Sequence, residues 1–237
     1  MEISIIIAGF NEQDNVFPLV RETAEVMRPL NRSYEIVYVN DGSTDETGEK
    51  LREAASQFSE LRVITHDRNY GQSAALLSAF ECIRGDVIVT MDADLQNDPK
   101  DIPRLLDELP SCHLVTGIRV KRRDNLKRKI STFVANRVRV FFLKDGIKDA
   151  GCAMRAYRKQ VIKQLIPFRG LHRFLPTLCR IHGFRVRQIP VNHRPRLHGE
   201  AKYGIGNRLF VGVQDMFAVR WYKKRHISIK RKYSDDI

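Results

Sequence analysis

The sequence predicts an α/β protein with a mostly parallel central sheet flanked by helices. Two observations carry this prediction. Short apolar runs that fit buried strands alternate with segments of helical periodicity over residues 3–118. The links between them are short, and a strand that is followed by a helix and a further strand pairs in parallel. With 237 residues and 43% hydrophobic content, the chain is long enough for one large domain.

The predicted elements follow one another in a regular order. Strands are expected where short, largely apolar runs occur, at residues 3–8, 34–40, 61–66, 86–91, 113–118, 151–157 and 185–191. Helices are expected where apolar residues recur every three or four positions, over 16–27 and 71–80. Another helix is expected to open at Ser43 or Thr44, and one more at Pro99, which Asp98 would cap.

The second half of the chain contains two basic segments with helical periodicity, 126–144 and 205–222. The apolar positions of the second segment are Leu209, Val213, Met216, Phe217 and Trp221. A helix with an apolar side and a Lys/Arg-rich side can lie in the headgroup layer of a membrane; alternatively, its apolar side packs on the sheet. We expect a domain over residues 1–203, followed by an amphipathic helix and basic tail over 204–237.

The formal net charge of +13 favours an anionic partner: nucleic acid, an acidic membrane surface or a phosphorylated substrate. No motif of a DNA- or RNA-binding module is present, so nucleic acid is not an expected partner. The four cysteines lie far apart and lack metal-ligand spacing, which favours reduced thiols. The sequence has no signal peptide and no apolar run long enough for a transmembrane helix, so we expect a cytoplasmic protein.

Polar clusters follow three of the predicted strands, at residues 11–12, 40–43 and 92–96. Because parallel strands end at one edge of a sheet, these clusters are expected to converge there. Asp92 and Asp94 point the same way if the chain stays extended. Two close carboxylates repel each other and prefer a cation between them, and the Gln96 carbonyl adds a third oxygen. The cluster therefore predicts a site for Mg²⁺ or Mn²⁺, unless Asp94 and Asp98 merely cap turns.

Eight motifs together resemble a known family. The segments AGFNE, VNDGSTDET, DRNYGQSAAL and DADLQNDP occur in the order found in family-2 glycosyltransferases of the GT-A fold. The segments GIRVKRRD, RKIS, KDAGCAMRAYRK and HRPRLHGEAKYG are similar to those of its polyprenyl-phosphate branch. That branch includes dolichol-phosphate mannosyl and undecaprenyl-phosphate glycosyl transferases. The resemblance covers most of residues 1–222.

The resemblance implies a role for individual residues. The nucleotide of a nucleotide-diphosphate sugar would be held by Ala8, Phe10, Glu12, Val39 and Asp41. The metal would be held by Asp92, Asp94 and Gln96, and the donor diphosphate by the same loop with Ala93, Arg196 and Lys202. The acceptor phosphate would be bound by Arg119, Arg123 and Arg128. Among these residues, the catalytic ones would be Asp92, Asp94, Arg119 and Arg128.

The implied reaction is an inverting transfer of the sugar to a polyprenyl (dolichyl or undecaprenyl) phosphate. A lipid phosphate is already anionic at pH 7, so the reaction needs charge stabilisation rather than a strong base. A soluble glycan or protein acceptor is the alternative, although a neutral hydroxyl would require a carboxylate base. Many relatives continue into transmembrane helices, whereas this sequence continues into a polar tail. We therefore expect a peripheral protein on the cytosolic face of an anionic membrane, acting alone or with a separate small membrane protein.

Overall fold

A single seven-stranded sheet forms the centre of the protein. The structure is a computed structural model that describes residues 1–120, 137–196 and 205–227. The strand order is β3-β2-β1-β4-β6-β5-β7. The strands are β1 (Ile3–Gly9), β2 (Tyr34–Asn40), β3 (Leu61–Thr65), β4 (Val87–Asp92), β5 (Leu114–Arg119), β6 (Arg155–Arg158) and β7 (Val186–Val191). Strand β6 is antiparallel to β4 and β5, while the other paired strands are parallel, which confirms the predicted mostly parallel sheet.

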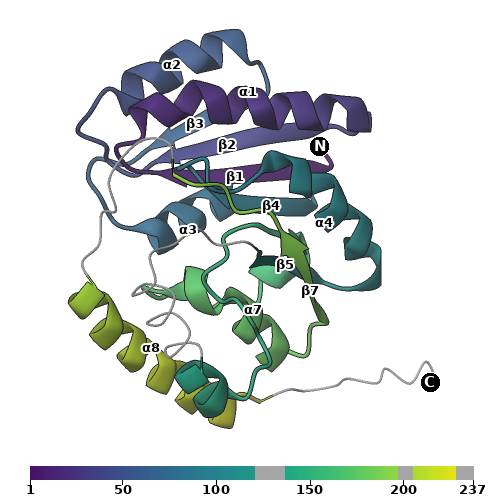
Figure 1. The fold of residues 1–237 in the computed structure, drawn as a ribbon, viewed down its shortest axis with the longest axis vertical. Coiled ribbons are helices and arrows are strands. Elements are labelled where there is room, and N and C mark those ends of the chain that lie inside the picture. The colour runs from purple at the N-terminus through teal and green to yellow at the C-terminus, as the bar shows by residue number, and fades with distance from the viewer. Residues whose placement is uncertain (121–136, 197–204, 228–237) are drawn as a thin grey trace, which may run out of the picture.

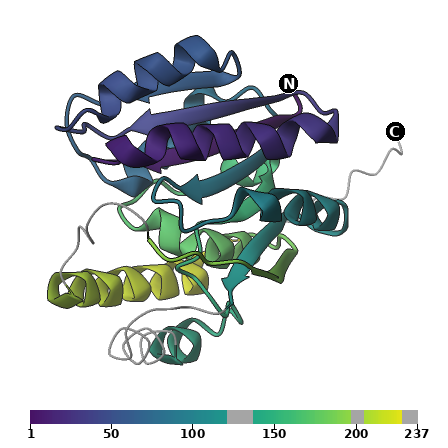
Figure 2. The ribbon, with the colours of Figure 1, turned by 45° about the horizontal axis from the view of Figure 1, so that its top comes forward.

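Helices cover both faces of this sheet (Figure 1). One face packs against α1 (Val16–Met27), α2 (Thr47–Gln57) and α4 (Ile102–Glu108). The other packs against α3 (Gln72–Cys82), α6 (Lys159–Ile162) and α7 (Leu171–Ile181). Helix α8 (Ile205–Arg225) lies outside α7, next to the helical segment 137–143 (Figures 1 and 2). Short 3-10 helices are η1 (Gln13–Asn15), η2 (Arg28–Leu30), η3 (Pro99–Asp101) and η4 (Leu109–Ser111).

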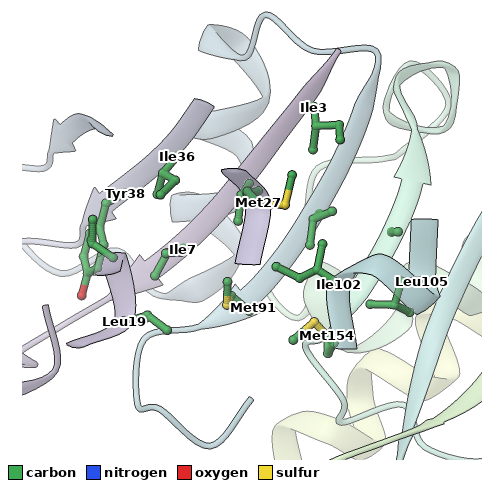
Figure 3. Close-up of a cluster of buried hydrophobic side chains, with 14 of the residues drawn as sticks. Ile3, Ile7, Leu19, Met27, Ile36, Tyr38, Met91, Ile102, Leu105 and Met154 are labelled. Atoms are coloured by element: carbon green, nitrogen blue, oxygen red, sulfur yellow. The ribbon is translucent and has the colours of Figure 1, made fainter. Parts of the chain in front are cut away.

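The central strands are apolar on both faces because helices cover both. In β1, Ile3, Ile5 and Ile7 face the layer of α1, α2 and α4, while Ile6 faces α3 and α7. This alternation follows from the two-residue period of a strand. Figure 3 shows Ile3 and Ile7 among side chains from other strands and from α1 and α4. Continuous apolar runs in the sequence therefore mark strands that are buried on both sides.

At the end of β1, the backbone of Gly9 packs closely against the Tyr38 side chain of β2. A Cβ atom added at Gly9 would lie 2.3 Å from the hydroxyl oxygen of Tyr38 and 3.0 Å from the Cβ of Ala93. Tyr38 is fully buried, and its hydroxyl has no hydrogen-bond partner among the residues that the structure describes. Glycine fits at position 9 because the Tyr38 side chain of the neighbouring strand β2 occupies the space that a Cβ atom would need.

We expect Gly9→Ala to lower the free energy of unfolding by about 1–3 kcal/mol, because the methyl group overpacks this space. Urea denaturation measures the change. Tyr38→Phe removes the closest atom and forfeits no hydrogen bond, so Gly9→Ala should cost less in a Tyr38→Phe background. An equal cost in both backgrounds would contradict this account.

Three parts of the predicted fold differ from the structure or lie beyond it. Helix α2 begins at Thr47 rather than at Ser43 or Thr44, because Asp45 first accepts a hydrogen bond from the Thr47 N–H in a turn. Helix α7 was not predicted at all. The predicted boundary at residues 203 and 204 and the first part of segment 126–144 lie outside the described residues.

The predicted C-terminal helix is present as α8, but its predicted single apolar stripe is not confirmed. Met216 and Val219 are buried against α7, whereas Phe217 and Trp221 are exposed. Over the part of the chain that the structure describes, no helix combines the length and the apolar character needed to cross a bilayer.

Candidate active site

The carboxyl ends of β1, β2 and β4 meet at one edge of the sheet. Ala8, near the end of β1, pairs with Val39 of β2 on one side and with Asp92 of β4 on the other. Phe10, Glu12 and Asp41 follow directly after these strands. The pairing brings the three polar clusters of the sequence together at this edge.

The residues predicted to hold a nucleotide differ in their burial and in their hydrogen bonds. Val39 is fully buried in the core, and Glu12 is buried with its carboxylate accepting a hydrogen bond from Asn15 (2.6 Å). The buried carboxylate of Asp41 accepts hydrogen bonds from the N–H groups of Tyr70 (3.0 Å) and Gly71 (2.7 Å). Asp41 therefore orders the loop between β3 and α3, besides any role at the nucleotide.

The acidic pair lies where β4 stops. The strand ends at Asp92, and residues 93–95 bend, with Leu95 in the left-handed region at φ 59°. The Asp92 carboxylate accepts a hydrogen bond from the Gln72 amide (2.5 Å), and that of Asp94 accepts one from the Arg196 guanidinium (2.6 Å). The predicted extended geometry at Asp94 is therefore wrong, yet the turn keeps both carboxylates within electrostatic reach of each other.

The electrostatics of Asp92 reflect this crowding. Little of its surface is exposed, and burial, followed by repulsion from Asp94, raises its pKa to about 6. Arg119 and Arg155 oppose this shift without cancelling it. Two adjacent, mutually repelling carboxylates are the oxygen donors that a hard divalent cation prefers, so the pair fits Mg²⁺ or Mn²⁺. No group of three or more His, Cys, Asp or Glu that would bind a metal occurs within the described residues.

This raised pKa predicts a pH-dependent cost of folding. The pKa of Asp92 rises from 3.8 to about 6 on folding, so the carboxylate destabilises the folded state once it ionises there. In metal-free buffer, wild-type stability should fall by about 1–3 kcal/mol relative to Asp92→Asn as pH rises through this window. Denaturation of both proteins at the two ends of the window measures the difference. A constant gap between them would contradict the shift.

Two arginines flank Asp92 from neighbouring strands. Arg119 ends β5, and its backbone N–H, Nε and Nη2 donate to the Asp149 carboxylate at 3.2, 2.8 and 2.8 Å. Burial alone would lower the pKa of Arg119, but these hydrogen bonds and the charge of Asp149 outweigh it and raise the pKa. Arg155 begins β6 opposite Thr90 and donates to the carbonyls of His172 and Ala150. Both positive charges therefore lie at the edge where Asp92 ends β4.

Residues 193–196, which are distant in sequence, also contact the loop that follows β4. His193 forms a bridge with Asn97, and the Arg194 N–H donates to the Gln96 carbonyl (2.9 Å). Arg194 also forms ion pairs with Glu22 and Asp98, each at 2.6 Å. These contacts hold residues 193 and 194 against the loop that follows β4. The Arg196 guanidinium therefore lies close enough to donate a hydrogen bond to the Asp94 carboxylate. The positions of Arg123, Arg128 and Lys202 lie outside the described residues.

Sequence reasoning assigned no role to several residues that shape this site. Gln72 and Arg155 lie inside the quoted motifs DRNYGQSAAL and KDAGCAMRAYRK, which was the only signal that marked them. Asn97 accepts a hydrogen bond from the Asp92 N–H through its side-chain oxygen (2.9 Å), and Asp149 accepts hydrogen bonds from Arg119. Gln72 lies 20 positions from Asp92, and Asp149 lies 30 positions from Arg119.

The open α/β sheet, with an acidic loop and arginines at the carboxyl ends of its strands, is the architecture of the GT-A class of fold. The family model "Glycosyl transferase family 2" matches residues 4–166. The chain belongs to this family.

Over the aligned residues, curated relatives are more than one third identical to the chain. Undecaprenyl-phosphate 4-deoxy-4-formamido-L-arabinose transferase of Edwardsiella ictaluri is 38% identical over 86% of this chain and 63% of its own length. Dodecaprenyl-phosphate galacturonate synthase of Rhizobium johnstonii is 37% identical over 94% of this chain and 68% of its own length. The chain thus spans roughly two thirds, and in the first case slightly less, of these relatives.

Solved structures support the fold. Glucosyl-3-phosphoglycerate synthase from Mycobacterium tuberculosis, in complex with Mn²⁺, UDP and glucosyl-3-phosphoglycerate, superposes with a TM-score of 0.70. The match covers 94% of this chain and 79% of that chain at 16% identity. The same enzyme with Mn²⁺, UDP and phosphoglyceric acid gives a TM-score of 0.71 at 17% identity, over 96% of this chain and 80% of that one. At these identities the likeness establishes the fold, which confirms the predicted GT-A architecture.

Proposed function

We propose that the protein is an inverting, metal-dependent glycosyltransferase that moves a sugar from a nucleotide diphosphate to a polyprenyl phosphate. The observation that carries this proposal is that negatively and positively charged side chains lie close together at the carboxyl ends of the strands. The carboxylates of Asp92 and Asp94 lie beside Arg119, which interacts electrostatically with Asp92. A displacement between a nucleotide diphosphate and a phosphate nucleophile needs both: an anionic anchor for a cation and a cationic anchor for the acceptor.

On the donor side, Asp92, Asp94 and Gln96 would hold Mg²⁺ or Mn²⁺. Such an ion supplies neutralisation of the charge that develops on the departing nucleotide diphosphate. Arg196, which lies at Asp94, is placed to donate to the same phosphates, with Lys202 following in the chain. Phe10, Glu12 and Asp41 would face the nucleoside, with Ala8, Val39 and Ala93 forming the wall behind it.

On the acceptor side, Arg119 would bind the lipid phosphate together with Arg123 and Arg128. Asp149 occupies one side of the Arg119 guanidinium, so it orients this group. An Asp149 carboxylate held in an ion pair is a poor base for a neutral hydroxyl, which favours a phosphate acceptor over a soluble glycan or protein. The names of the relatives, which specify undecaprenyl and dodecaprenyl phosphate, support this acceptor class.

The proposal also includes the site of action and the division of the chain. Residues 1–203 would form the transferase domain, and the helix and basic tail of 204–237 would bring it to the cytosolic face of an anionic membrane. Acting there as a peripheral protein, it would reach the lipid directly or with a separate small membrane protein. Nucleic acid has no place in this function.

The proposed function is tested by supplying the protein with Mn²⁺, a panel of nucleotide sugars and a short, water-soluble polyprenyl phosphate. We expect one donor to yield a glycosylated lipid of inverted anomeric configuration, detected by mass spectrometry and NMR. Replacing the polyprenyl phosphate with the corresponding alcohol should abolish the product. Transfer to the alcohol at the same rate would overturn the phosphate-acceptor assignment.

A further inference from the structure

Two histidines and a tyrosine meet where two helices end. His182 directly follows α7, and His226 directly follows α8. The hydroxyl oxygen of Tyr222, in the last turn of α8, lies 3.1 Å from Nε2 of His182 and 3.0 Å from Nδ1 of His226. The two imidazole rings lie 4.4 Å apart between centroids, with their planes inclined at 66°. Two ring nitrogens and one phenol oxygen, from elements far apart in the sequence, therefore converge on one point.

The backbone holds both histidines in place without help from their rings. The His182 N–H caps α7 by donating to the carbonyls of Leu178 and Arg180. The His226 N–H donates to the carbonyl of Tyr222 (2.7 Å) and so continues the hydrogen-bond pattern of α8. Side chains of α7 and α8 also share one buried apolar cluster, so the two helix ends keep their relative position. The fold thus preorganises the three donor atoms.

The electrostatics of this point favour a cation. The C-terminal end of a helix carries a partial negative charge, and the ends of α7 and α8 both lie here. Burial, followed by repulsion from His226, lowers the pKa of His182, so this ring is neutral near pH 7 and keeps a lone pair. Lys223, which follows Tyr222 in the chain, donates to the carbonyl of Leu143 (2.6 Å) instead. Its charge is therefore directed to the end of segment 137–143.

The donor set selects the class of ion. Neutral imidazole nitrogens bind Zn²⁺, Ni²⁺ and Cu²⁺, whereas Mg²⁺ and Mn²⁺ prefer carboxylate and other oxygen ligands. Zinc ligands lie about 2.0–2.1 Å from the metal in a tetrahedral site, which places them roughly 3.3 Å from one another. The distances from the Tyr222 oxygen to the ring nitrogens of His182 and His226 are within a few tenths of an ångström of that value. All three side chains are only partly buried, so water can provide the fourth ligand.

The cluster lies well away from the acidic pair at the end of β4. Helix α7 begins near that pair, where Arg155 donates to the carbonyl of His172. His182 follows ten residues later, about 15 Å farther along the helix. Asp92 and Asp94 therefore share no ligand with the cluster, and an ion bound at one place does not occupy the other.

We propose that His182, Tyr222 and His226 form a second metal site, which binds a divalent transition ion of the Zn²⁺ class and fastens the end of α8 to the end of α7. The ligands come from both helices, so they lie together only when the helices are docked. Binding therefore stabilises the docked arrangement over any arrangement in which α8 has separated. The site uses no residue of the proposed function and is independent of it.

Calorimetric titration with ZnCl₂ tests the site, on the full chain without an affinity tag. Excess Mg²⁺ in the buffer occupies sites with oxygen ligands and does not compete for imidazole. We expect uptake of one Zn²⁺ per chain. His226→Asn should weaken it at least about tenfold, because loss of a ligand costs at least as much as loss of a residue that supports one. His113→Asn removes an imidazole that accepts from the Arg185 N–H instead, so this matched control should bind Zn²⁺ as the wild type does.

Two further variants test the geometry. Tyr222→Phe keeps the ring and removes the oxygen, so Zn²⁺ binding should weaken while the fold is retained. With Mg²⁺ held constant, Zn²⁺ should raise the urea midpoint of unfolding of the wild type and leave that of His182→Asn unchanged. An equal rise in both proteins would overturn the site. So would equal Zn²⁺ affinities of the wild type, His226→Asn and His113→Asn, since the ion would then bind elsewhere.

Sugar transfer separates this inference from the proposed function. With Mg²⁺ and no transition ion, His226→Asn should transfer sugar to the short, water-soluble polyprenyl phosphate at the wild-type rate. A wild type that is active but takes up no Zn²⁺ would overturn the second metal site alone. A wild type that binds Zn²⁺ through His182 and His226 but transfers no sugar would reject the proposed function and leave the second metal site standing.

Discussion

Asp94→Ala is expected to reduce the rate of sugar transfer by about a thousandfold or more while the fold survives. Asp94 provides one of the two carboxylates at the end of β4, and its replacement removes half of the charge that would hold a cation at the donor diphosphate. The measurement is turnover at saturating donor and acceptor, with circular dichroism and urea denaturation to establish folding. Asp94→Asn should behave similarly, because the amide carries no charge and its single oxygen replaces only one of the two carboxylate oxygens that accept from Gln96 and Arg196.

Asp86→Ala is the matched control for this prediction. Asp86 is an exposed carboxylate that directly precedes β4, at the opposite edge of the sheet. Its loss removes the same charge from the molecule without touching the carboxyl edge, so activity should persist. If Asp94→Ala turns over as fast as Asp86→Ala, the acidic pair has no part in the chemistry.

Arg119→Lys is expected to raise the acceptor KM by about tenfold to a hundredfold and to leave the Kd of the nucleotide unchanged. The guanidinium is planar and donates twice to Asp149 from one side, which leaves the donors of its other side facing away from Asp149 and placed to meet a phosphate. Lysine keeps the charge that Asp149 requires but not the two-sided geometry. Steady-state kinetics with the short polyprenyl phosphate and calorimetric titration with a nucleotide diphosphate measure the two quantities.

Lysine is a better probe here than alanine, because Arg119→Ala removes the positive charge that faces the buried Asp149 carboxylate and costs stability as well. Arg104→Lys is the matched control, since Arg104 of α4 is exposed and also forms an ion pair with a buried carboxylate, that of Asp101 in η3. An equal weakening of nucleotide and acceptor binding in Arg119→Lys would reject a specific role at the acceptor.

Local sequence patterns predicted most of the fold because they report local physics. The strands β1, β2 and β4 are buried on both faces, so each appears as a continuous apolar run. Helix α7 escaped prediction, although Leu171, Phe174, Leu175 and Leu178 recur at helical spacing. Pro176 lies inside it, and proline normally argues against a helix. Packing of this apolar face against the sheet and α8 overrides that local preference.

The site divides in the same way. The chain alone established that carboxylates and an amide follow a buried strand, and that arginines cluster in the second half. Its motifs placed Gln72 and Arg155 in characteristic segments without saying what they touch. Only the folded chain brings Gln72 to Asp92, Asp149 to Arg119, and residues 193–196 alongside 96–98.

The sequence by itself determined the alternating α/β class, the acidic turn after β4 and the excess of positive charge. These features follow from the periodicity of apolar residues and from the residue types at adjacent positions, both of which can be read directly from the sequence. The tertiary structure decided which groups distant in sequence meet. It places Arg119 near Asp92, brings Arg196 to Asp94, and packs segment 137–143 against α8. Such contacts arise from sheet order and helix packing, which a local period does not encode.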